Sequence, residues 1–163
     1  MSTWKQFTKE VRAILDSETK DKIYDEKIKK LKKIINNIKT SPEHLGQLEK
    51  ILESKNKSSK ILDHGCGNCF TVLFLILKGY KNVWGATVNF SNDIKTIKYV
   101  RNINKIISII LGSSKNKRVI IYDGLNLPFS KDYFDIIFTK QVLEHIPPDS
   151  KSKFLEEEKR VLN

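Results

Sequence analysis

Two cysteines, a histidine and two glycines stand close together in the stretch ILDHGCGNCF, residues 61–70. Cys66 and Cys69 form a C-x-x-C pair with His64 shortly before it, a pattern typical of thiol redox chemistry or of a metal site. The same stretch is a glycine-rich turn after an apolar run, which favours a loop that holds a nucleotide. The elements around the stretch must decide between these interpretations.

A metal site needs more ligands than the sequence offers near this stretch. Zinc takes about four ligands, and beyond His64 the remaining histidines are His44 and His145, with no second C-x-x-C and no H-x-H pair. A disulfide between Cys66 and Cys69 would be strained and reducible rather than structural. We therefore expect neither a metal nor a dithiol site and favour the nucleotide loop.

The second part of the chain, residues 58–163, alternates strand and helix patterns. The connections between strands are too long for hairpins and indicate right-handed crossovers. We therefore predict an α/β fold with a parallel sheet of about four strands and helices on both faces. The predicted strands cover residues 60–63, 82–88, 118–122 and 135–139, and the predicted helices cover 69–78, from 91–93 to about 111, and 150–162.

The glycines of the opening stretch lie where the first predicted strand gives way to the first helix. Ligands of open α/β sheets bind at this carboxyl edge. Gly65 and Gly67 permit a sharp turn and a close approach to the backbone, while the helix N-terminus attracts an anionic group. The position therefore favours a ligand-binding loop.

The first part of the chain, residues 1–57, shows only helical periodicity. Apolar residues recur at steps of three and four from Trp4 to Ile14 and from Tyr24 to Ile38. Ser41-Pro42-Glu43 has the residues of a helix start and predicts a third helix. We expect residues 1–57 to form a helical extension or lid on the domain of residues 58–163.

Composition limits the class of protein. The chain of 163 residues is 39% hydrophobic, enough for one sizeable core. No apolar run approaches the roughly 20 residues of a bilayer span, and the first residues lack a signal-peptide core, so we expect a soluble cytoplasmic protein. The formal net charge is +11, but the lysines are spread along the chain, so solvated faces and an RNA-binding face both stay open.

Four segments, in this order, resemble class I S-adenosylmethionine-dependent methyltransferases. The family shares a D-x-G-x-G loop, a D-x-x-x-L-PF segment, FD at the start of the fourth strand with LEH after it, and RVL at a helix end. A glycine loop alone would be weak evidence for this family, but four segments in the right order and spacing are a specific signature. They are ILDHGCG, GATVN, DGLNLPFSKDYFDIIFTKQVLEHI and FLEEEKRVLN, over about residues 45–163. The resemblance implies a Rossmann-like fold and S-adenosylmethionine as the cofactor.

The resemblance also implies roles for individual residues. The glycine loop with Asp63 would hold the methionine portion of the cofactor, and Asp123 would accept a hydrogen bond from the adenine amine. Thr139 and Gln141 would lie between cofactor and substrate, and His145 is of a type that can take a proton near neutral pH. The implied cofactor-binding residues are Asp63, Gly65, Cys66, Gly67, Thr87, Asn89, Asp123, Gly124, Leu125 and Thr139, with Gln141 and His145 as candidate catalytic residues.

Two positions depart from the family pattern. Cys69 stands in place of the third glycine, and Thr87 in place of the acidic residue that binds the ribose hydroxyls. Thr87 or Asn89 could form a weaker neutral hydrogen bond there. Some relatives, including cyclopropane-fatty-acid-synthase-like proteins, also have Thr at this position.

The family pattern normally continues after RVL with a fifth strand, whereas this sequence ends at Asn163. We expect a fragment, a reduced protein, or a sheet completed by self-association or by a partner chain, because the fourth strand would otherwise have an unpaired edge. The leading functional interpretation is in-line methyl transfer to a small molecule or lipid-like substrate. The alternatives are an RNA methyltransferase and a non-catalytic cofactor-fold module.

Overall fold

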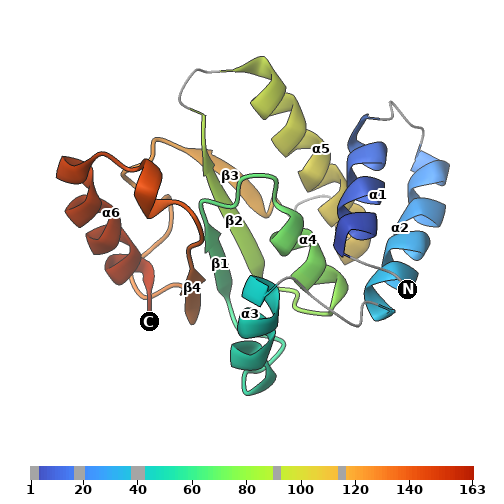
Figure 1. Cartoon of the computed structure of the whole chain (residues 1–163), viewed down its shortest axis with the longest axis horizontal. Coiled ribbons are helices and arrows are strands. Elements are labelled where there is room, and N and C mark those ends of the chain that lie inside the picture. Colours follow the sequence, from blue (N-terminus) through green and yellow to red (C-terminus); the bar gives the residue numbers. More distant parts are fainter. Residues whose placement is uncertain (1–3, 17–20, 38–42, 90–92, 114–116) are drawn as a thin grey trace.

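A computed structural model describes residues 4–16, 21–37, 43–89, 93–113 and 117–163 (Figure 1). A central sheet separates helix α6 on one side from helices α4, α5, α1 and α2 on the other. The strands are β1 (Ile61–His64), β2 (Val83–Val88), β3 (Val119–Tyr122) and β4 (Ile136–Phe138). The helices are α1 (Trp4–Asp16), α2 (Asp21–Asn36), α3 (Glu43–Glu53), α4 (Phe70–Leu77), α5 (Ile94–Leu111) and α6 (Pro148–Val161), with a short 3-10 turn η1 (Leu143–His145).

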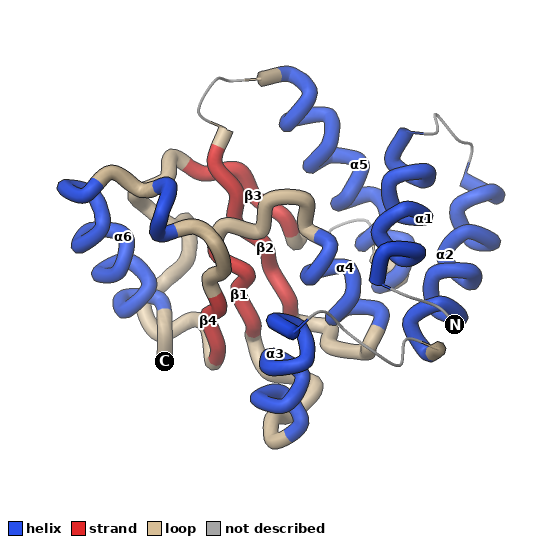
Figure 2. Tube along the Cα trace, in the orientation of Figure 1, coloured by secondary structure: helices blue, strands red, loops and turns tan. Residues whose placement is uncertain are grey.

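The four strands form one parallel sheet in the order β3-β2-β1-β4. β1 lies in the middle, with Leu62 aligned to Trp84 on β2 and to Ile137 on β4. Figure 2 shows the loops that leave the carboxyl ends of the strands on one side of the sheet. The predicted α/β fold, with a parallel sheet covered on both faces, is confirmed.

Alternation along the strands divides the core into two clusters. Ile61 and Val83 face α4 and α5 and belong to the larger cluster. Leu62 and Trp84, one position further along each strand, belong to the smaller cluster on the α6 side. Successive side chains of a strand point to opposite faces, so neighbouring residues of β1 meet different environments.

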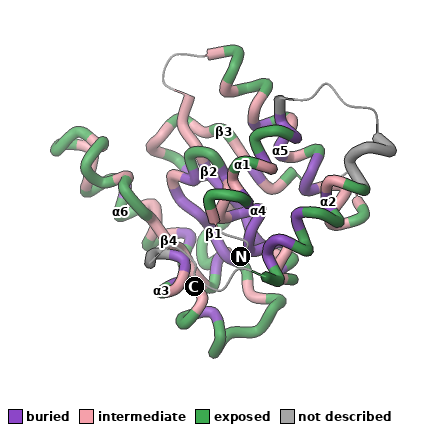
Figure 3. Tube along the Cα trace, turned by 45° about the vertical axis from the view of Figure 1, so that its right-hand side comes forward, coloured by how far each residue is buried: buried purple, intermediate pink, exposed green. Residues whose placement is uncertain are grey.

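The N-terminal helices share the larger core cluster with the sheet domain. Phe7 of α1 is fully buried, with ring centroids 5.0 Å from Trp4 and 6.2 Å from Phe74 of α4. Leu31 of α2 and Leu45 of α3 are also fully buried in this cluster. Figure 3 shows buried positions recurring along α1 and α2 between exposed ones. These helices therefore pack as part of the core.

Some element boundaries differ from the sequence expectation. Cys69 precedes α4 with a φ of 54° rather than opening the helix. α6 begins at Pro148, before the predicted residue 150, because proline suits the first turn of a helix. Asp93 caps α5 by accepting a hydrogen bond from the Lys95 amide, at the end of the segment 91–93 where this helix is predicted to begin. The predicted cap at Ser41 lies outside the described residues.

The end of the chain runs beside the start of the edge strand β4. Leu162 forms a parallel bridge with Phe134, and the Asn163 amide donates to the Phe134 carbonyl at 2.8 Å. The Tyr133 amide donates to the Val161 carbonyl at 2.8 Å. These bonds fix the end of α6 against the sheet.

None of the helices in the described part of the chain is long and apolar enough to cross a membrane.

Replacing Phe7 tests whether α1 belongs to the core or acts as a detachable lid. Phe7→Ala should lower the free energy of unfolding by about 3 to 5 kcal/mol, because it empties a fully buried aromatic site. Urea denaturation measures the loss, and Lys9→Ala on the exposed side of the same helix is the control. An unchanged main transition in Phe7→Ala would show that α1 is separable.

Asp63 is a carboxyl group within the core, only 5% exposed. It shares the α4 face with Ile61, two positions earlier on β1. Burial raises the pKa of Asp63 from 3.8 to about 8. The folded state therefore keeps a proton that the unfolded state releases, so the contribution of Asp63 to stability falls as pH rises through this interval.

Asp63→Asn should remove this pH dependence. Relative to wild type, the variant should gain stability progressively from about pH 4 to about pH 8 and show no further relative gain above that range. Urea unfolding at several pH values measures the difference between the two proteins. A difference that stays constant across the interval would mean that Asp63 is ionised in the fold.

Candidate functional site

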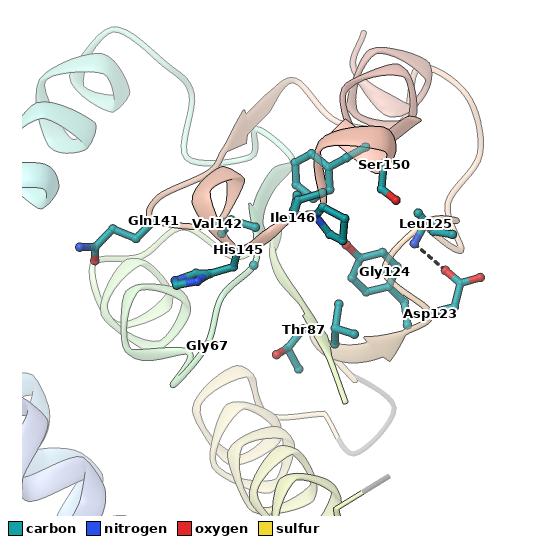
Figure 4. Close-up of a pocket in the computed structure, with 15 residues that line it drawn as sticks. Gly67, Thr87, Asp123, Gly124, Leu125, Gln141, Val142, His145, Ile146 and Ser150 are labelled. Atoms are coloured by element: carbon teal, nitrogen blue, oxygen red, sulfur yellow. Dashed lines mark hydrogen bonds between the residues drawn. The ribbon is translucent and has the colours of Figure 1, made fainter. Parts of the chain in front are cut away.

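A cavity of about 440 Å³ opens at the carboxyl edge of the sheet (Figure 4). Figure 4 shows it between Gly67 and Thr87 on one side and Ile146 and Ser150 on the other. Eight of the residues implied by the family resemblance line it: Gly65, Gly67, Thr87, Asp123, Gly124, Leu125, Gln141 and His145. The fold thus gathers residues from four separate segments around one space.

The turn after β1 is held by the neighbouring strand. The amides of Gly65 and Cys66 both donate to the Ala86 carbonyl of β2, at 2.9 and 3.0 Å. Gly65 has a φ of 87°, and a Cβ there would lie 2.2 Å from Val142, so only glycine fits between the turn and the loop after β4. Gly67 also has a positive φ, but a Cβ there would meet open space. The backbone at Gly67 therefore leaves room for a ligand.

The two cysteines lie beneath this turn. Their sulfur atoms are 3.2 Å apart, and both residues are buried in the larger core cluster. The hydrogen bond with Cys69, together with burial, raises the pKa of the Cys66 thiol. Cys66 fills the space beside Gly85 and does not line the cavity. Among the described residues, no group of three or more His, Cys, Asp or Glu side chains could hold a metal ion.

Two residues at the end of β2, Thr87 and Asn89, could bind the ribose hydroxyls, but their side chains lie in different places. Thr87 lines the cavity. Asn89 does not, because its side chain is used at the start of α5: its Oδ1 accepts from the Asp93 amide at 2.9 Å, and its Nδ2 donates to the Asp93 carbonyl at 3.2 Å. The geometry favours Thr87 as the residue that faces a ligand.

The end of β3 forms a tight polar turn. The Asp123 carboxylate accepts hydrogen bonds from the amides of Leu125 and Asn126 and from the Asn126 side chain, at 2.6 to 2.8 Å. The Asn126 side chain and then the two amides hold the pKa of Asp123 below its ordinary value. Gly124 has a φ of 89° and turns the backbone along the cavity wall. Asp123 is thereby kept as an ionised acceptor at the rim.

The segment after β4 supplies the two candidate catalytic residues. His145 lies in η1, is exposed and faces the cavity. Gln141 lies at the rim, with its side chain pointing away from the other labelled residues (Figure 4). Thr139 does not line the cavity, because its hydroxyl donates to Glu158 of α6. Asp63 does not line the cavity either.

Sequence reasoning missed the residues on the α6 side of the cavity. Tyr122, Ser150 and Phe154 line it, and His64 lies behind Tyr122, 1% exposed. The sequence pattern indicates His64 only as a possible metal ligand. The apolar alternation of β1 gives a signal for its position, since His64 lies on the same face as buried Leu62.

Comparisons with solved structures agree with this fold. One similar structure is geranyl diphosphate C-methyltransferase from Streptomyces coelicolor, solved with S-adenosyl-L-homocysteine. It is 15% identical to this chain with a TM-score of 0.57, and the match covers 93% of this chain and 50% of that protein. A Galdieria sulphuraria protein provisionally named as a sarcosine dimethylglycine methyltransferase is 24% identical with a TM-score of 0.54, over 74% of this chain and 41% of its own. The chain spans about half the length of these proteins or less.

No curated protein matches the chain. The family model described as a methyltransferase domain matches residues 62–163, which is more than half of the sequence. This stretch contains the turn after β1, the Asp123 turn and the loop after β4. The chain therefore belongs to the methyltransferase-domain family, with the Rossmann-like fold of S-adenosylmethionine-dependent methyltransferases.

Proposed function

We propose that the chain binds S-adenosylmethionine in the cavity and directs its methyl group to a small-molecule acceptor. The observation that carries the proposal is that the turn at Gly65 and Gly67 and the turn at Asp123 border one cavity. Its volume of about 440 Å³ lies within the usual range of small-ligand sites. The open space beside Gly67, which a larger side chain would occupy, supports binding of the cofactor there.

The residues present suit the two ends of the cofactor. Asp123, held ionised at the rim, would accept from the adenine amine. Thr87 would offer its hydroxyl to the ribose, and the backbone at Gly67 would lie against the methionine portion. When bound, the cofactor supplies a methyl group on a positively charged sulfur, so the protein has mainly to align an acceptor and exclude water.

The cavity lining favours a small acceptor over RNA. Among the described residues that line it, there is no lysine or arginine to neutralise a phosphate backbone. Much of the wall is apolar, with Val142, Ile146 and Phe154 facing the space. His145 at the mouth is the residue proposed to contact the acceptor.

Calorimetric titration with S-adenosylhomocysteine tests this proposal. Gly67→Val should weaken binding at least about tenfold, or about 1.4 kcal/mol, because the branched side chain would enter the space that the ligand needs. Gly112→Val is a matched control: Gly112 also has a positive φ with open space at its Cβ, but it ends α5 away from the cavity.

Both variants place valine in the left-handed region, at a cost of about 1 to 2 kcal/mol in stability, so their thermal melts should be similar. Only Gly67→Val should lose affinity. Equal affinity of wild type and Gly67→Val would place the cofactor elsewhere. A wild-type chain that does not bind at all would leave a non-catalytic module as the better interpretation.

A further inference from the structure

Four polar side chains behind the cavity form a continuous chain of hydrogen bonds, which we call the His64 network: Tyr122, His64, Glu158 and Thr139. The Nε2 atom of His64 lies 2.6 Å from the Tyr122 hydroxyl oxygen, and its Nδ1 atom lies 2.8 Å from Oε1 of Glu158. Thr139 donates its hydroxyl proton to the same Glu158 oxygen. Tyr122 alone of the four lines the cavity.

The sheet brings these residues together from distant parts of the chain. His64 ends β1, Tyr122 ends β3 and Thr139 follows β4, and the alternation of each strand points them toward α6, which carries Glu158. β2 lies between β3 and β1. The residue of β2 aligned with His64 is Ala86, small enough to let the Tyr122 ring reach across.

Packing holds the imidazole in one orientation. The His64 ring stacks on the Phe154 ring with centroids 4.1 Å apart and planes 4° from parallel. His64 is 1% exposed, so water does not compete for its two nitrogen atoms. Both nitrogens have a partner, which satisfies the buried ring.

The partners determine where the protons lie. An ionised Glu158 can only accept, so the Nδ1 atom of His64 must carry a proton and donate it. In a neutral imidazole the Nε2 atom then has a lone pair and accepts the Tyr122 hydroxyl proton. Burial raises the pKa of Tyr122, which keeps that proton on the phenol oxygen at rest. Tyr122 lines the cavity, and its oxygen keeps lone pairs that the bond to His64 does not use.

We propose that the Tyr122 oxygen receives the proton of the methyl acceptor, with His64 and Glu158 as its positioning residues, and that the acceptor is therefore a hydroxyl or amine group. This inference rests on the proposed function. The acceptor oxygen or nitrogen forms a bond to the methyl carbon, and the electron pair of the broken carbon–sulfur bond stays on sulfur. The acceptor proton passes to Tyr122 while the Tyr122 proton passes to Nε2 of His64. The resulting imidazolium is balanced by Glu158.

The tautomer of His64 is a test that needs no acceptor. In nitrogen-15 spectra of the labelled wild-type chain near neutral pH, His64 should be protonated at Nδ1 and unprotonated at Nε2. His145, which is exposed, serves as the internal comparison. A His64 protonated at Nε2, or at both nitrogens in the resting protein, would overturn the inference, because the Tyr122 oxygen would then be occupied by a donor.

Binding separates this inference from the proposed function. Tyr122→Phe removes only the hydroxyl of a residue that lines the cavity, so the variant should bind S-adenosylhomocysteine within about threefold of wild type. Tyr133→Phe is the control, since Tyr133 packs in the same core cluster but does not line the cavity. A large loss in Tyr122→Phe alone would assign the hydroxyl to the cofactor and overturn the inference while leaving the proposed function intact. A wild-type chain that does not bind would contradict both.

Transfer of labelled methyl from S-adenosylmethionine completes the test. The acceptor probes are ethanolamine, glycerol and phenol, with dimethyl sulfide as a probe that has no such proton. Transfer to a hydroxyl or amine probe should be at least about 100-fold slower in Tyr122→Phe and unchanged in Tyr133→Phe. The slower rate should appear in kcat rather than in KM. Transfer to dimethyl sulfide should not be slowed in Tyr122→Phe, because it releases no proton. Equal slowing of transfer to dimethyl sulfide and to the hydroxyl or amine probes would contradict the assignment.

Discussion

The turn after β1 depends on one carbonyl group of the neighbouring strand. The Ala86 carbonyl of β2 accepts hydrogen bonds from the amides of both Gly65 and Cys66, so the turn between β1 and α4 is fixed to the neighbouring strand. These two bonds form because β1 and β2 are parallel and Ala86 is aligned with His64. The turn therefore stays open at Gly67, and the cavity, the Asp123 turn and the loop at Val142 are arranged around it.

Neighbouring residues of β1 have opposite surroundings. Asp63 points under α4, where burial alone raises its pKa to about 8. His64 points under α6, where Glu158 and Tyr122 satisfy both ring nitrogens. Desolvation without a charged partner favours a neutral carboxyl, whereas a paired imidazole can hold or pass a proton. One strand thus contributes a largely static group to one face and a hydrogen-bonded network to the other.

The sequence predicted most of the helices and strands because the patterns that indicate them are local. Apolar runs and the glycines at 65 and 67 predicted the strands, the crossovers and the turn. The family pattern also led to most of the residues that line the cavity. It could not show that the Asn89 side chain is used in capping α5, or that Thr139 turns toward Glu158. The pair formed by His64 and Glu158 spans 94 positions, so no local pattern indicates it.

The N-terminal helices show a similar limit. Their periodicity predicted which sides are apolar, but not that α4 would be the partner or that Phe7 would pack against Phe74. An amphipathic pattern defines a surface to be covered, while the covering element depends on tertiary packing. The helices predicted as an extension or lid have buried residues in the larger core cluster.

The central claim is that a cofactor binds where the turns after β1 and β3 meet. Amide spectra of the nitrogen-15-labelled chain during titration with S-adenosylhomocysteine test it most directly. The signals of Gly67, Gly124 and His145 should shift together and saturate, while those of Gly79 and Gly112, which lie away from the cavity, should not. Saturable shifts confined to other residues, with Gly67 and Gly124 unmoved, would contradict the account.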